Sequence, residues 1–324
     1  MTADIFAEWL RRQGHHVVRT ASSYWYDQGP RCYQAFPYHW VINPPGEELS
    51  QFLRQNRALS LRYSAPLDAP AGRISYHMVY ARPTYDFEDL GKWARKNVRR
   101  GMRSCSVEPI NFERLADEGW SLQQDTLDRQ QRSAPISQAA WRNLCGAAAS
   151  LPGFEAWGAL VSNQLAASVI TSRIHECCYM LYQQCRREHL PEHVNNALSF
   201  KVTQTMLGHP SIHSVFYGLH SLDAPSSIDE FKLRMGYAAK PVRQRVAFHP
   251  WCSPLANPVT HRMLNGLLAL RPSSRILAKG EGMMRFFLEG KQPIERQSVP
   301  EVLAMSQEGR ELPLLPGAPA HLHL

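Results

Sequence analysis

Hydrophobic side chains follow two different periods in the first 83 residues, which predicts a mixture of helices and strands. They recur at helical spacing in residues 4–13 and again, after Pro44, Pro45 and Gly46, at Leu49, Phe52 and Leu53. They alternate at every second position in residues 59–63 and 74–80, as in strands with one buried face. The turn AlaProAlaGly separates the two alternating stretches and predicts that they are consecutive strands.

Residues 86–101 form the clearest predicted helix of this region. Its apolar side chains share one side of the helix and are Phe87, Leu90, Trp93, Ala94 and Val98. Gly101 occupies the position of a left-handed residue after the last turn. The other side carries a basic stripe, made of Lys92, Arg95, Lys96, Arg99, Arg100 and Arg103. Such a stripe is typical either of a solvated helix face or of a surface that binds an anion or an acidic substrate.

The order of the predicted elements becomes informative from residue 106 onward. A short strand near Val107 and two helical regions come first, at residues 112–132 and 137–149. Three apolar strands joined by short polar turns follow, at residues 157–161, 165–174 and 177–184. Three consecutive antiparallel strands are therefore predicted. The remaining elements are a helix, a strand, a short helix and a strand, at residues 194–206, 213–218, 227–236 and 237–248.

Composition adds a positive charge made almost entirely of arginine. The length of 324 residues is enough for about two domains, and 44% of the residues are hydrophobic, which is enough for buried cores. The formal net charge is +8, and 29 of the 36 basic residues are Arg. Arginine offers a planar fork to carboxylates and phosphates, so the excess favours an anionic partner. A biased genome composition would produce the same count.

Location and redox state follow from what the sequence lacks. Neither a leader-like N-terminus nor a stretch of the roughly 20 apolar residues that a membrane span requires is present. The chain is therefore expected to be soluble and cytoplasmic, with no membrane partner. Its seven cysteines form no CxxC pair and no cluster at zinc-ligand spacing, so we expect reduced, mostly buried thiols and no metal.

Two segments resemble the GNAT acyl-CoA N-acyltransferase fold, and in particular its FemAB-like branch. They are WGALVSNQLAASVITSRIHECCYMLYQQC at 157–185 and VFYGLHSLDAPSSIDEFKLRMGY at 215–237. The second contains a PheLys and a downstream GlyTyr that close the domain in that branch, here Phe231, Lys232, Gly236 and Tyr237. The resemblance implies an α/β (α+β) fold with a mixed, mostly antiparallel sheet and flanking helices. It covers about residues 85–248.

The resemblance also implies a division of the chain. Residues 1–84 would be a degenerate GNAT-like region, so that two GNAT-like units follow in tandem, and residues 85–250 would be the acyltransferase domain. Residues 251–290 are predicted to form two C-terminal helices. Residues 291–324 are Pro-rich and predicted to be disordered.

By the same resemblance, the chain would bind acyl-CoA as a co-substrate, without a resident cofactor. The pantetheine arm would lie between two splayed strands, and its pyrophosphate would meet the N-terminus of the helix at 194–206. The residues implied to contact the donor are Gln184, Arg186, Arg187, Asn195, Asn196 and Lys232. The acceptor would be an amino group of a small molecule or a peptide.

The expected phosphate loop departs from the family pattern. Standard GNAT enzymes carry glycines there, whereas residues 186–196 read RREHLPEHVNN and contain none. Two alternatives therefore stay open beside acyl-CoA. One is an aminoacyl-tRNA donor, known for FemAB relatives, which the basic stripe would serve, and the other is a non-catalytic binding module.

Direct attack by an amine requires a base and a proton donor to the leaving group. The candidates are Glu188 or His193 as the base, and Tyr217, His220 or Asp223 after the following strand. Cys185 beside Arg186 and Arg187 is the alternative, as a nucleophile that forms a covalent intermediate.

Overall fold

The computed structural model describes residues 1–29, 31–130, 136–221, 227–272 and 274–303. The chain forms two compact units, each made of separate segments. Unit 1 comprises Met1–Val17, Met78–Gly218 and Phe231–Tyr237, and unit 2 comprises Val18–His77, Leu219–Glu230 and Ala238–Leu324. The ranges expected from the sequence were consecutive, whereas the chain leaves each unit and returns to it.

The strands of unit 1 are arranged in the order β10-β9-β8-β7-β6. Their bounds are β6 (Ser106–Ile110), β7 (Phe154–Val161), β8 (Gln164–Ile174), β9 (Cys177–Cys185) and β10 (Ser214–Leu219). β6 to β9 are antiparallel to their neighbours, while β10 is parallel to β9. The three predicted antiparallel strands are thus confirmed, because the polar turns at Ser162 and His175 adopt positive φ and reverse the chain.

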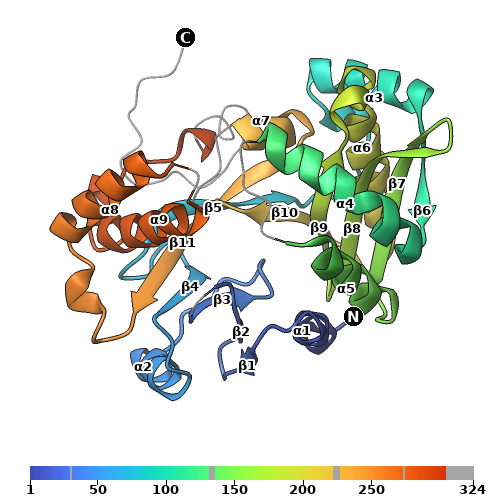
Figure 1. Cartoon of the computed structure of the whole chain (residues 1–324). Helices are drawn as coiled ribbons and strands as arrows, with labels where there is room; N and C mark the ends of the chain where they lie inside the picture. The colour runs from blue at the N-terminus through green and yellow to red at the C-terminus, as the bar shows by residue number, and fades with distance from the viewer. Residues whose placement is uncertain (30, 131–135, 222–226, 273, 304–324) are drawn as a thin grey trace, which may run out of the picture. The chain divides into compact units, whose positions relative to one another are not determined.

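Helices pack on these strands, and β7, β8 and most of β9 are buried. The bounds are α1 (Ala3–Arg12), α3 (Lys92–Ser104), α4 (Phe112–Arg129), α5 (Gln138–Ala149) and α6 (Val194–Leu207). α4 and α6 contact the strands, α5 lies beside α4, and α3 lies beside α6 (Figure 1). Almost every residue of β8 is buried, as expected for a strand covered on both faces.

The predicted helix at 86–101 is corrected at both ends. Residues 87–89 form a short 3-10 turn, η1 (Phe87–Asp89), and α3 begins only at Lys92. Gly101 lies inside α3 and does not terminate it. An added Cβ at Gly101 would lie 2.4 Å from the carbonyl oxygen of His193, so the absence of a side chain permits α3 to approach the start of α6.

Unit 2 contains the strand order β1-β2-β3-β4-β11-β5. The bounds are β1 (Val17–Arg19), β2 (Tyr24–Asp27), β3 (Cys32–Phe36), β4 (Ser60–Ala65), β5 (Arg73–Tyr80) and β11 (Ala238–Phe248). β11 lies between β4 and β5, and it pairs antiparallel with β4 from Arg243 opposite Ala65 to Phe248 opposite Ser60. β4 and β5 are therefore consecutive in the chain but are not neighbours in the sheet.

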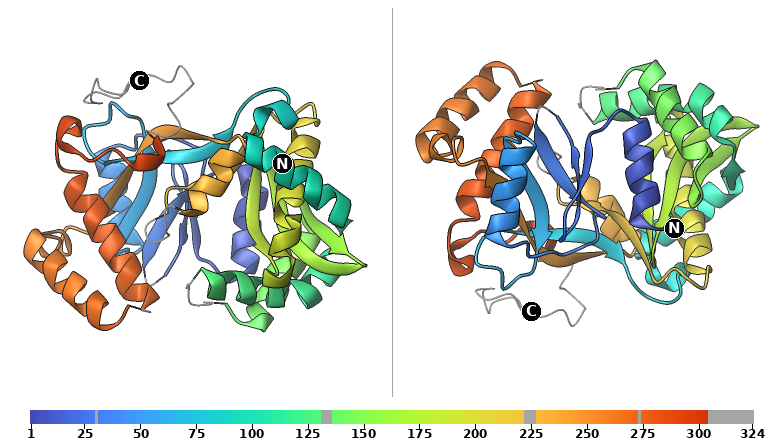
Figure 2. Two further views of the ribbon diagram at one scale, coloured as in Figure 1. Left: turned by 90° about the horizontal axis from the view of Figure 1, so that it is seen from above. Right: turned by 90° about the horizontal axis from the view of Figure 1, so that it is seen from below.

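Helices of unit 2 cover the same strands. α2 (Gly46–Gln55) packs Leu49, Phe52 and Leu53 into a core with Trp25 and Tyr63. α9 (Arg275–Glu289) packs along β11, and α8 (Pro258–Leu270) packs on α9 (Figure 2). η3 (Ser253–Leu255) and η4 (Ile294–Arg296) are short turns, and α7 (Ser227–Arg234) runs from unit 2 into unit 1. Of the tail at 291–324 that was expected to be disordered, residues 291–303 are described, and they include η4 and the buried side chains of Gln297, Val302 and Leu303. Residues 304–324 lie outside the described residues.

Candidate functional site

β9 and β10 pair over a short distance and then separate. Their parallel pairing runs from Ser214 opposite Cys177 to Phe216 opposite Tyr179, whereas β9 continues to Cys185. In this second part of β9, Tyr182 has a φ of 51° and the register with β8 shifts. A positive φ at a bulky residue marks a bulge, which turns the strand away from its neighbour. The splayed strands expected at the donor site are therefore present.

A chain of hydrogen bonds crosses from β10 to α6 at this opening. The Tyr217 hydroxyl on β10 donates to the side-chain carbonyl of Gln183 on β9. The amide nitrogen of Gln183 donates in turn to Oδ1 of Asn195 at the start of α6, at 2.7 Å. Lys232 Nζ lies 5.2 Å from the centre of the Tyr217 ring. Burial raises the pKa of Tyr217, so its hydroxyl stays protonated at neutral pH.

His193 is held at the start of α6 in a left-handed conformation, with φ 58° and ψ 29°. Its carbonyl oxygen accepts from the backbone N–H groups of Asn196 and Ala197, at 3.0 and 3.2 Å. Burial, and secondarily the charge of Arg100 on α3, lowers the pKa of His193. The imidazole is therefore neutral at neutral pH and able to accept a proton.

The two arginines predicted to meet the donor phosphates have protein partners. Arg187 donates its backbone N–H to the carboxylate of Asp125, and its side chain lies 3.1 Å from Oδ2 of Asp128. Arg186 donates from Nε to the carbonyl of Leu165 at 3.0 Å and from Nη2 to Ser121. Two carboxylates of α4 thus neutralise Arg187 beside the expected phosphate position.

The remaining donor-site and base candidates differ in exposure. Gln184 is buried, and its Oε1 has no hydrogen-bond partner among the residues that the structure describes. Asn196 donates from its amide to the sulfur of Met235 at 3.5 Å. Glu188 is mostly exposed, and its Oε1 lies 3.7 Å from Nε2 of His189. Glu188 therefore lies in solvent within η2 (Arg187–Glu192), the 3-10 turn that precedes α6.

Cys185 does not have the environment of a nucleophile. Its backbone N–H donates to Thr126 Oγ1 at 3.0 Å, and burial raises the pKa of its thiol to about 12. The nearby Arg129 acts in the opposite direction, but its effect is smaller than that of burial. A thiol of this kind is almost entirely protonated at neutral pH, which disfavours the covalent alternative.

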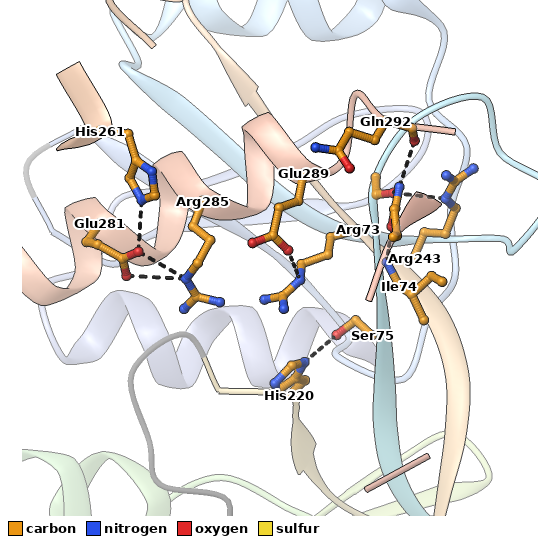
Figure 3. A network of polar contacts seen from close by, with 12 residues as sticks. Arg73, Ile74, Ser75, His220, Arg243, His261, Glu281, Arg285, Glu289 and Gln292 are labelled. Atoms are coloured by element: carbon orange, nitrogen blue, oxygen red, sulfur yellow. Dashed lines mark hydrogen bonds and ion pairs between the residues drawn. The ribbon is translucent and has the colours of Figure 1, made fainter. Parts of the chain in front are cut away.

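His220 belongs to unit 2, and its side chain contacts residues of that unit. Its Nδ1 lies 3.1 Å from Ser75 Oγ (Figure 3). Its ring stacks on Tyr76 with 4.5 Å between ring centres. Burial, followed by the charge of Arg73, lowers the pKa of His220 to about 3. Asp223 lies outside the described residues.

Solved structures match this architecture, although no family model and no curated protein matches the sequence. FemX matches with a TM-score of 0.57 and 10% identity, over 78% of this chain and 93% of FemX. The C-terminal domain (DUF2156) of a protein assigned as a lysylphosphatidylglycerol synthetase from Agrobacterium fabrum has a TM-score of 0.52 and 12% identity, over 84% and 93%. L-PGS from Bacillus licheniformis has 0.50 and 10%, over 76% and 91%. The chain has a FemAB-like GNAT fold. The expected fold is thereby confirmed.

A basic surface borders the site of this GNAT-like unit. α3 contains six basic residues and no acidic one, and it packs against α6 and η2. Five of the six basic side chains are exposed, namely Lys92, Lys96, Arg99, Arg100 and Arg103. None of the six forms an ion pair with another described residue. We call this face of α3, including Trp93, the basic surface.

Helical spacing predicts that Trp93 lies on the buried side of its helix, and this prediction is wrong. The side chain is 70% exposed, and Lys96 Nζ lies 5.8 Å from the centre of its ring. The buried side is instead made of Ala94, Val98 and Gly101, because α3 starts at Lys92 and faces α6 with its small residues. An exposed aromatic beside basic charge is typical of surfaces that bind nucleic acids.

Sequence reasoning also missed Gln183, Asp125 and Asp128. Gln183 precedes the buried Gln184 on β9, and strand alternation alone indicated that the two point to opposite faces. The acidic pair on α4 carried no signal, since its role depends on Arg187, a residue 62 positions from Asp125. Within the described ranges, no three His, Cys, Asp or Glu side chains are grouped so as to hold a metal ion.

Proposed function

We propose that this chain is an acyl transferase that moves an acyl group onto an amino group at the opening between β9 and β10. One observation carries the proposal. The two strands separate after Tyr179 and Phe216, and the polar chain of Tyr217, Gln183 and Asn195 lies where they separate. In a GNAT fold this opening accommodates the acyl donor, so a proton donor and a helix N-terminus meet there.

The proposed reaction uses one base and one acid. The acceptor nitrogen attacks the acyl carbon, and neutral His193 removes the proton of the amine. A C–N bond forms while the bond from the acyl carbon to the donor oxygen or sulfur breaks. Protonated Tyr217 gives its proton to that leaving atom. Glu188, in the same loop, is the second candidate for the base.

The donor we favour is an aminoacyl-tRNA. Backbone N–H groups of residues 187, 189 and 193 already donate within the protein, to Asp125, Arg186 and Leu190. They are not available to a pyrophosphate, and the carboxylates of α4 disfavour one beside Arg187. The basic surface, by contrast, offers charge and an exposed ring to a polyanion, beside the same helix N-terminus.

Acyl-CoA remains a second candidate donor, on a different observation. Beyond residue 179, β9 has a backbone edge turned away from β10. An extended pantetheine arm can pair with such an edge as an added strand. Asn195, Asn196 and Lys232 border that region and would then bind the donor.

Single-turnover transfer tests both donors. The full chain is mixed with labelled total aminoacyl-tRNA or with a series of acyl-CoAs, and with a mixture of primary amines. We expect transfer from aminoacyl-tRNA, with binding that weakens steeply as salt rises, by a log–log slope of about 0.9 per phosphate contact. Transfer from acyl-CoA alone would assign the second donor. Transfer from neither would overturn the proposal and leave a binding module.

A charge-reversal pair tests the basic surface. Lys96→Glu with Arg99→Glu should weaken tRNA binding by tenfold or more, on the order of 1.4 kcal/mol, because two phosphate contacts become repulsive. The matched control is Arg54→Glu with Arg57→Glu, which changes the net charge equally on an exposed part of unit 2. Equal weakening by the two pairs would show that only net charge matters.

A further inference from the structure

Helix α8 is apolar on two opposite faces, and only one of them is covered. On the inner face, Leu264 Cδ2 would lie 3.8 Å from a Cβ added at Gly280 of α9, so the two helices are in contact. On the outer face, four large side chains at helical spacing are exposed, and they are Val259 (66%), Met263 (66%), Leu267 (52%) and Leu270 (80%). Exposed apolar side chains gathered on one face of a helix are typical of an interaction site. The exposed outer face of α8 is therefore a candidate binding surface.

Neighbouring segments extend this outer face. Trp251 is 86% exposed and Leu255 is 65% exposed, both just before α8. Ile276, in the first turn of α9, is 76% exposed. Of the 13 most exposed large hydrophobic residues in the described chain, seven lie between 251 and 276. We call these seven residues the α8 patch. Such a concentration in one short stretch of chain is typical of an interaction surface, whereas scattered apolar residues need no explanation.

Positive charge accompanies the α8 patch. Residues 249–288 contain five Arg or Lys and a single acidic residue, Glu281. Glu281 is already paired, at 3.0 Å from both His261 Nε2 and Arg285 Nε (Figure 3). Arg262, by contrast, is exposed on α8, and Arg271 is exposed directly after its last residue. The surface around the apolar side chains is therefore cationic.

We propose that the α8 patch binds the surface of an anionic lipid membrane. An interfacial helix buries an apolar face at the headgroup boundary, places Lys and Arg beside it, and is anchored by Trp. α8 and Trp251 supply these parts. A second copy of the chain fits less well, because its patch would carry the same positive charge from Arg262 and Arg271. Charge complementarity favours a negatively charged surface.

This inference revises one expectation from the sequence. No membrane partner was expected, because the chain has no long apolar stretch, and no helix in the described residues is long and apolar enough to span a bilayer. A helix lying in the interface needs no such length. With 13 residues, α8 is roughly 20 Å long, which suits a position parallel to the surface. The proposal does not depend on the acyl-transfer chemistry.

Vesicle flotation with the full chain tests the α8 patch. The probes are vesicles of phosphatidylcholine alone and vesicles in which one-third is replaced by phosphatidylglycerol. We expect the protein to float with the anionic vesicles and to remain below with the neutral ones, with less binding at high salt. Met263→Asp should reduce the bound fraction about tenfold, because it places a charge in the buried face. Arg262→Glu should reduce binding to the anionic vesicles.

Val41→Asp is the matched control. Val41 is a 39% exposed apolar residue of unit 2 outside the α8 patch, so the introduced charge is the same. It should float like the parent, and equal melting temperatures would show that both variants fold. A parent protein that floats with neither vesicle would overturn the proposal. So would binding insensitive to Met263→Asp, or a dimer in solution that Met263→Asp dissociates, since a second copy would then cover the patch.

Discussion

The Tyr217 hydroxyl donates a hydrogen bond to the side chain of Gln183, across the place where β10 and β9 cease to pair. The bond joins two strands that no longer share backbone hydrogen bonds there. It also fixes the direction of the phenol, because Gln183 is itself held by Asn195 of α6 at 2.7 Å. A strand, a neighbouring strand and a helix N-terminus thus position one proton donor.

Tyr217→Phe should therefore abolish most of the transfer without unfolding the protein. Removing a general acid costs about 10²- to 10⁴-fold in rate. We expect kcat to fall by that range while KM for the donor changes little, because the ring and its packing are retained. The measurement is steady-state or single-turnover transfer with the donor that the parent protein uses.

Tyr237→Phe is the control for losing a buried hydroxyl. Tyr237 lies with its ring 5.1 Å from that of Tyr217, and its hydroxyl is 2.6 Å from Thr203 Oγ1. Loss of that bond should lower the free energy of unfolding by about 1 kcal/mol and leave kcat near the parent value. If both variants lose transfer equally, Tyr217 has no chemical role.

Gly101→Ala should disturb the start of α6 from a distance. The new Cβ would lie 2.4 Å from the His193 carbonyl oxygen and 3.0 Å from the Ala197 side chain, so α3 or α6 must move. We expect a lower melting temperature and a loss of transfer, because His193 and Asn195 are displaced together. Differential scanning fluorimetry and the transfer assay measure the two effects.

Gly146→Ala is the matched control on another helix of unit 1. Nothing lies within 4 Å of a Cβ added there. Alanine favours the helix by about 0.5–1 kcal/mol over glycine, so this variant should melt slightly higher and keep its activity. A Gly101→Ala variant as stable and active as the parent would show that the close approach of α3 is unimportant.

The pH dependence of transfer should identify the base. Burial lowers the pKa of His193 from its ordinary 6.5, so the base is deprotonated at neutral pH. The rate should stay constant down to about pH 6.5 and fall only below it, as His193 takes up a proton. His193→Gln should lower the rate and remove this acidic limb, whereas Glu188→Ala should preserve it.

Arg100→Ala is a second test of whether the acidic limb of the pH–rate profile belongs to His193. Arg100 contributes to the lowered pKa of His193, so its loss should move the limb toward higher pH. The profile is measured at saturating donor, because Arg100 also belongs to the basic surface. A limb that moves the other way, or one that survives in His193→Gln, would assign the base to another residue.

The order of elements in the second half of the chain was predictable because each element is local. The strands β7 to β9 are apolar runs between polar turns, and α6 ends at Leu207, directly before Gly208. The position of β11 was not predictable, since it pairs with β4, whose residues lie 178 to 188 positions earlier in the chain. Arg243 is opposite Ala65, and Phe248 is opposite Ser60. No local pattern encodes a partner so distant in the chain.

The contacts at the site likewise could not be predicted where they join residues distant in the chain. Residues at the end of β9 and the start of α6 followed from the expected fold, but their partners did not. Arg186 and Arg187 had the charge expected of a phosphate site, and only the structure shows that Ser121, Asp125 and Asp128 hold them. The exposure of Trp93 depended on where α3 begins, a detail that helical periodicity leaves open by a residue or more.

Cys185→Ala should leave transfer within about twofold of the parent, because direct attack needs no enzyme nucleophile. Burial raises the pKa of this thiol to about 12, so iodoacetamide at neutral pH should neither label it nor inactivate the folded protein. Mass spectrometry of the alkylated chain identifies the labelled cysteines. Inactivation that tracks with labelling of Cys185 would restore the covalent mechanism.

Acid should destabilise unit 2 through His77. This histidine is buried on β5, with Nε2 2.7 Å from Ser64 Oγ, and burial lowers its pKa to about 3. The unfolded chain takes up a proton near pH 6.5 and the folded one does not, so stability falls as the pH drops below 6.5. The free energy of unfolding should fall with a limiting slope of about 1.4 kcal/mol per pH unit, or roughly 2 kcal/mol between pH 6.5 and 5.

Urea unfolding at several pH values measures this slope. The slope of the unfolding free energy against pH should be shallower in His77→Gln, whereas His209→Gln, at an exposed position, should keep the parent slope. Equal slopes for parent and His77→Gln would mean that His77 is protonated in the folded state.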